Sequence, residues 1–216
     1  MGQIMEAIFC VAYLVVTPIF GVLILKSTKR GARLFAVMTL VLVGGDAFHL
    51  IPRIIAAITG NENAVALGFG TLVTSFTMTI FYVLLFYFIC TLSRVQNSNF
   101  WRNIIVFLAI TRIVLLCFPQ NDWFSENAPL AWGIYRNIPF VAIGVIIVIL
   151  LYKYLSMHKD FKFAWLAVAL SFVFYLPVVL FAKDIPAVGM FMLPKTVCYV
   201  WLVIMGYNFS KRKLRR

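Results

Sequence analysis

The sequence predicts an all-α integral membrane protein, a bundle of seven transmembrane helices with its N-terminus outside and its C-terminus in the cytoplasm. Three observations predict this fold: the composition, the spacing of the apolar stretches and the distribution of positive charge. Of the 216 residues, 63% are hydrophobic and only 12% are charged, whereas a soluble domain has roughly 25% charged residues. A chain of this composition is expected to surround its helices with lipid.

Seven apolar stretches are separated by short polar connectors, and each has close to the roughly 20 residues that a helix needs to cross a bilayer. The first lacks the basic start and cleavage site of a signal peptide, so we expect it to be retained as a span. We predict one transmembrane domain over residues 1–210 and a basic cytoplasmic tail over 211–216. The predicted spans are 4–25, 34–59, 67–92, 103–118, 129–152, 163–182 and 186–208.

Positive charge lies almost entirely on one side of these spans. The connectors of that side and the tail hold fourteen Lys and Arg residues, whereas Lys183 is the only one in the connectors of the other side. The positive-inside rule therefore predicts the orientation stated above, in the plasma membrane. Anionic lipid accounts for the basic tail, so we expect no nucleic-acid partner.

Several ionisable residues nevertheless lie inside the apolar stretches, where charge is costly and usually marks a polar cavity or an ion pair. Because successive helices run in opposite directions, the rise of about 1.5 Å per residue places all of them in the outer half of the membrane. They come from five different stretches, and this convergence favours a common site over scattered structural pairs. These residues are Glu6, Asp46, His49, Arg53, Arg112, Arg136 and Lys195.

The segment 44–53 has the densest polar pattern of the chain. Asp46, His49 and Arg53 are spaced at i, i+3 and i+7, which puts all three on one face of a helix. A structural ion pair between two helices is the alternative interpretation of these charges.

Four basic residues against two acids leave about two positive charges uncompensated, which is unfavourable in lipid unless an anion or water enters. We therefore predict an outward-facing polar cavity that binds a small anionic ligand, a carboxylate, phosphate or lipid head group, for sensing or transport. The predicted ligand-binding residues are Glu6, Arg53, Arg112, Tyr135, Arg136, Asn137 and Lys195.

Two other functions are compatible with the same residues. Asp46 and His49 have the chemistry of a catalytic acid–base pair, which suggests a membrane-embedded enzyme acting on a lipid or small solute. A zinc site is not expected, because only one histidine lies within a span. Lys195 is similar in position to the Schiff-base lysine in the seventh helix of retinal proteins, which would make Asp46 or Glu6 its counter-ion. No other cofactor is indicated.

Two local features complete the prediction. Pro52-Arg53 and Pro194-Lys195 each place a cation directly after a proline within a span, which predicts a helix kink beside the polar group. The connector 118–124 is expected to lie over the cavity, with Trp123 and Phe124 in the aromatic belt at the membrane surface.

Overall fold

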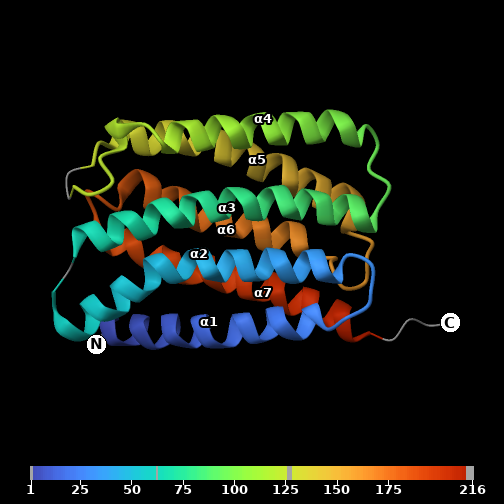
Figure 1. Cartoon of the computed structure of the whole chain (residues 1–216), viewed down its shortest axis with the longest axis horizontal. Coiled ribbons are helices and arrows are strands. Elements are labelled where there is room, and N and C mark those ends of the chain that lie inside the picture. The colour runs from blue at the N-terminus through green and yellow to red at the C-terminus, as the bar shows by residue number, and fades with distance from the viewer. Residues whose placement is uncertain (1, 62, 126–127, 213–216) are drawn as a thin grey trace.

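The structure is a computed structural model that describes residues 2–61, 63–125 and 128–212. These residues form seven long α-helices and two short 3-10 helices, with no strand among them (Figure 1). All seven long helices are long and apolar enough to cross a membrane, as the sequence predicts. They are α1 (Gly2–Leu25), α2 (Ala32–Thr59), α3 (Ala64–Leu92), α4 (Ser98–Leu116), α5 (Leu130–Leu155), α6 (Ala164–Phe181) and α7 (Met192–Lys211); the 3-10 helices are η1 (Pro119–Asn121) and η2 (Pro186–Phe191).

The last predicted span differs from the structure at both ends. Its first residues form η2, and α7 begins only at Met192 and continues to Lys211, the first residue of the predicted tail; residues 213–216 lie outside the described part of the chain. Pro194 thus occupies the first turn of α7, where a backbone N–H has no helical partner to lose. The predicted kink beside Lys195 is therefore wrong, whereas Pro52 does lie inside α2.

The helices pack in chain order, and α7 returns to contact α1, so the bundle closes into a ring (Figure 1). Helix α3 also contacts α5 directly, which leaves α4 packed against both from outside the ring. The two ends of the described chain lie at opposite ends of the bundle. Helices that alternate in direction bring the start of α1, α3, α5 and α7 together with the end of α2, α4 and α6.

The half of the bundle nearest the C-terminus is filled by apolar side chains. Phe35, Phe88 and Phe161 pack edge to face with ring centroids 4.9–5.8 Å apart, and Phe209 joins them at 5.4 Å from Phe161. Arg212 closes this end through an ion pair of 3.0 Å with Asp160. The opposite half contains the polar residues.

Helices α2 and α3 approach closely because small residues stand at their contact. A Cβ atom on Gly45 would lie 1.7 Å from Oγ1 of Thr77, and one on Gly70 would lie 2.2 Å from the carbonyl oxygen of Phe48. Small residues are the usual means by which membrane helices pack closely. The contact holds the Asp46–Arg53 face of α2 against the hydroxyl-bearing face of α3, and Thr74 donates a 2.9 Å hydrogen bond across it to the Gly45 carbonyl.

Two adjacent glycines of α2 provide a test of this contact. We expect Gly45→Ala to lower the free energy of unfolding by about 1–3 kcal/mol, because the β-branched Thr77 has little freedom to move away. Gly44→Ala is the control, since no atom lies within 4 Å of a Cβ at that position. It should be neutral or raise stability by about 0.5–1 kcal/mol through helix propensity. Denaturant or thermal unfolding in mild detergent measures both, and equal effects would contradict the proposed packing constraint.

Candidate functional site: an intramembrane cavity with unpaired cations

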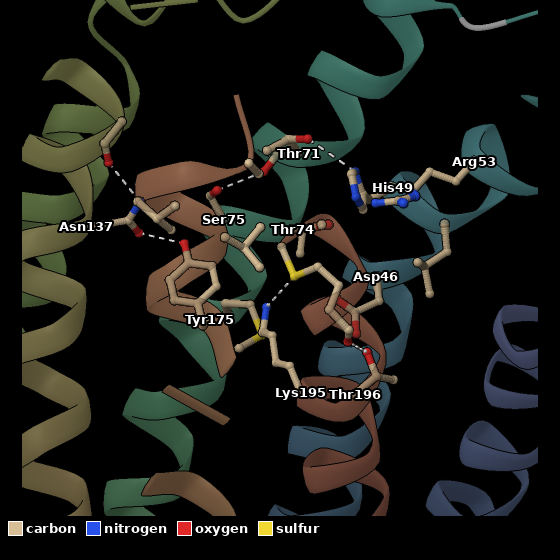
Figure 2. Close-up of a pocket in the computed structure, with 18 of the residues that line it drawn as sticks. Asp46, His49, Arg53, Thr71, Thr74, Ser75, Asn137, Tyr175, Lys195 and Thr196 are labelled. Atoms are coloured by element: carbon tan, nitrogen blue, oxygen red, sulfur yellow. Dashed lines mark hydrogen bonds between the residues drawn. The ribbon is translucent and has the colours of Figure 1, made fainter. Parts of the chain in front are cut away.

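A cavity of about 430 Å³ lies inside the bundle, in the half that contains the start of α1 and the end of α2. Its walls come from α1 to α7, because the alternating helix directions bring the polar segment of each helix to the same depth. Figure 2 shows side chains from α2, α3, α5, α6 and α7 pointing toward this space.

All of the predicted site residues except Tyr135 line this cavity; they are Glu6, Asp46, His49, Arg53, Arg112, Arg136, Asn137 and Lys195. Tyr135 lies elsewhere: it is 52% exposed on α5 and its ring packs against Trp132. Gly133, Asn137 and Phe140 recur at helical spacing on the cavity side of α5, with Arg136 beside them, and Tyr135 lies off that side.

Arg112 is the most deeply buried charge of the site. It extends from α4, which is outside the ring, and is only 2% exposed. Its guanidinium carbon lies 3.5 Å from the ring centroid of Phe140 on α5, a cation–π arrangement. Its Nε and Nη1 atoms are buried and have no hydrogen-bond partner among the described residues.

Residues of the connector between α4 and α5 hold the Arg136 side chain in place. Its Nη1 donates a 2.9 Å hydrogen bond to Oδ1 of Asn121, and its guanidinium lies 4.0 Å from the ring centroid of Trp123. Asn121 is fully buried, and its amide donates to the carbonyls of Leu115 and Phe118. Trp123 therefore supports Arg136 and is not simply an interfacial residue as predicted.

The third cation, Lys195, lies beside two tyrosines. Its Nζ is 4.5 Å from the ring centroid of Tyr175 on α6 and 6.0 Å from that of Tyr199. Among the described residues, the Lys195 ammonium has one hydrogen-bond contact, a long one of 3.9 Å to Sδ of Met192. Tyr175 connects the cations to α5, because its hydroxyl donates a 2.7 Å hydrogen bond to Oδ1 of Asn137 (Figure 2).

The cavity has more positive than negative charge. Only one of its cations has a carboxylate within 4.0 Å in the described structure: Arg53 pairs with Glu6 at 2.5 Å. The other described ion pair, between Asp160 and Arg212, lies at the far end of the bundle. Arg112, Arg136 and Lys195 therefore face the same space, and none of them has an ion-pair partner among the described residues.

Asp46 and His49 have separate partners. Oδ2 of Asp46 accepts a 2.7 Å hydrogen bond from the hydroxyl of Tyr13, and Nδ1 of His49 lies 3.2 Å from Oγ1 of Thr71. No hydrogen bond or ion pair joins Asp46 to His49 in the described residues, so they do not form a directly coupled pair. Sequence reasoning missed Tyr13, although its spacing of seven residues from Glu6 places both on one helix face.

A second cavity, of about 400 Å³, adjoins the first near the end of α2. Glu6, Cys10, His49 and Arg53 line both spaces. The Glu6–Arg53 ion pair thus stands between the two cavities and joins α1 to α2.

Comparison of the chain with protein families, curated proteins and solved structures finds no match.

The Glu6–Arg53 pair is testable by charge neutralisation and exchange. The two side chains are 25% and 32% exposed, between the surface and buried cases, so Glu6→Gln and Arg53→Gln should each lower stability by about 1–2 kcal/mol. The exchanged pair, Glu6→Arg with Arg53→Glu, should recover part of that loss in thermal unfolding. Asp184→Asn, an exposed acid at the same end of the bundle, is the control. Additive losses in the exchanged variant would show that the pair does not stabilise the fold.

Proposed function

We propose that the protein binds a small anionic ligand, a carboxylate, phosphate or lipid head group, in the larger cavity for sensing or transport. The observation that carries this proposal is the convergence of Arg112, Arg136 and Lys195, from three helices, on one cavity; in the described part of the chain none of them has a carboxylate partner. Cations are expensive to keep away from water unless opposite charge compensates them. A bound anion supplies that charge.

The geometry of the two arginines favours an oxyanion. One face of each guanidinium is covered by an aromatic ring, Phe140 for Arg112 and Trp123 for Arg136. Donors on the guanidinium edge therefore remain for a ligand, and this edge matches the paired oxygens of a carboxylate or phosphate. Nε and Nη1 of Arg112, both without a partner among the described residues, lie on different edges of its guanidinium, and each shares its edge with Nη2.

The distribution of basic residues supports an orientation in which the cavity opens outward. Basic residues cluster in the connectors at the C-terminal end of the bundle, opposite the cavity. By the positive-inside rule that end is cytoplasmic, so the N-terminus and the cavity mouth face outward, and we propose the plasma membrane as the location.

One observation favours an enzyme as the second candidate. The hydroxyl of Thr71 donates to the Leu67 carbonyl at 2.8 Å, so its single proton is unavailable to His49. A proton on Nδ1 of His49 satisfies this contact, and Nε2 of the neutral imidazole is then an acceptor. An imidazole in this state on a cavity wall can act as a general base.

The test of the proposal is native mass spectrometry of protein purified in mild detergent. We expect a co-purifying anion whose occupancy falls at least about tenfold in Arg112→Gln and in Arg136→Gln, because each removes charge-assisted hydrogen bonds worth about 1.5–3 kcal/mol. Arg102→Gln, an exposed arginine near the other end of α4, is the matched control.

Arg112→Gln alters a buried residue, so Lys195→Met provides a second probe of the same charge cluster. Its thermal unfolding should remain cooperative while occupancy falls. Wild-type protein that carries no anion, or folded variants that carry as much as wild type, would contradict the proposal.

A further inference from the structure

The hydroxyl groups of α3 that line the cavity have all donated their protons to backbone carbonyls. Thr71 donates to Leu67 and Ser75 donates to Thr71, each at 2.8 Å, and Thr74 donates to Gly45 of α2 at 2.9 Å. A hydroxyl has one proton and two lone pairs. These three oxygens therefore offer a ligand only acceptor sites.

The neighbouring groups on α2 have the same character. Asp46 is a hydrogen-bond acceptor when ionised. The Tyr13 hydroxyl donates to its Oδ2, whereas its Oδ1 has no hydrogen-bond partner in the described residues. With its proton on Nδ1, His49 presents Nε2 as an acceptor. The α2–α3 side of the cavity is thus an acceptor wall, made of Asp46, His49, Thr71, Thr74 and Ser75 (Figure 2).

The cations of the cavity without an ion-pair partner among the described residues come from other helices, α4, α5 and α7, and form its donor wall; Arg53 on α2 is paired with Glu6. Arg112, Arg136 and Lys195 have no acceptor atoms in their charged groups. Both ends of the Asn137 amide are already occupied: Oδ1 accepts from Tyr175, and Nδ2 donates to the Gly133 carbonyl at 2.8 Å. This donor wall satisfies an oxyanion, but an anion without further polar groups would leave the acceptor wall unpaired. Unpaired buried acceptors carry a desolvation penalty.

We infer that the ligand of this cavity is a dipolar molecule, a small oxyanion that also carries an ammonium group. The oxyanion contacts Arg112, Arg136 and Lys195, and the donor group contacts Asp46 with Thr74 or Ser75. This inference rests on the anion-binding function proposed above and names its ligand class. A cavity of about 430 Å³ is within the range of small-molecule sites and accommodates an amino acid, a phosphorylated amino alcohol or the head group of a lipid.

Pairs of compounds that differ by one amine test this inference. Phosphoethanolamine against ethyl phosphate and glycine against acetate represent free solutes. Dihexanoyl phosphatidylethanolamine against dihexanoyl phosphatidylethanol represents a lipid head group. Isothermal titration in mild detergent should show, in at least one pair, that the amine-bearing member binds about tenfold or more tightly, as expected for one charged hydrogen bond. The pair that responds distinguishes a soluble ligand from a lipid.

Asp46→Asn should abolish the preference for the amine while keeping the oxyanion affinity, because its amide still accepts from Tyr13. Thr74→Val should reduce the preference. Thr91→Val is the matched control: Thr91 is also on α3 and donates to its own helix, at 2.8 Å to Tyr87, but does not line the cavity.

No preference within any pair, or a preference that persists in Asp46→Asn, overturns the inference. If both members of a pair bind equally and lose affinity in Arg112→Gln, anion binding stands and only the dipolar ligand fails. The anion-binding function itself is judged separately, from the anion that co-purifies.

Discussion

The arrangement of the polar half of the bundle depends on the burial of the Arg112 guanidinium. A charge on a helix outside the ring could point to lipid, at a high free-energy cost, or inward between two neighbouring helices. Arg112 points inward, and the ring of Phe140 covers its face. Two of its nitrogens then lack hydrogen bonds to the described residues, although Arg112 itself lines the cavity.

The positions of the other site residues reflect the division of the bundle into two halves. Phenylalanine side chains fill the interior of the end near the C-terminus, so helix packing there rests mainly on aromatic and aliphatic contacts. In the other half, the close approach of α2 and α3 at Gly45 and Gly70 brings Asp46 and His49 against the hydroxyls of α3. Arg112, Arg136 and Lys195 come from α4, α5 and α7, whereas Arg53 of α2 is paired with Glu6. The cations that have no ion-pair partner among the described residues therefore come from different helices than these acceptors.

This asymmetry bears on sensing, transport and catalysis alike. A receptor or transporter uses it to orient a dipolar ligand, whereas an enzyme uses the acceptor wall to remove a proton from a ligand held by the cations. The Glu6–Arg53 pair lies where the two cavities meet, together with Cys10 and His49. The three functions thus share one binding geometry and differ in the fate of the bound ligand.

The sequence by itself determined the seven apolar helices and the gathering of their charges at one depth. Composition and helix length suffice to predict the helices, and their alternating direction suffices to predict the depth of the charges. Both features depend only on the order of residues along the chain. Tertiary structure decided which charges meet. The rotation of α5 turns Arg136 inward and Tyr135 outward, the folding of the connector places Asn121 and Trp123 against Arg136, and the start of α7 makes Pro194 a first-turn residue. These outcomes depend on helix rotation and loop conformation, which are set by contacts between distant segments and not by spacing within one.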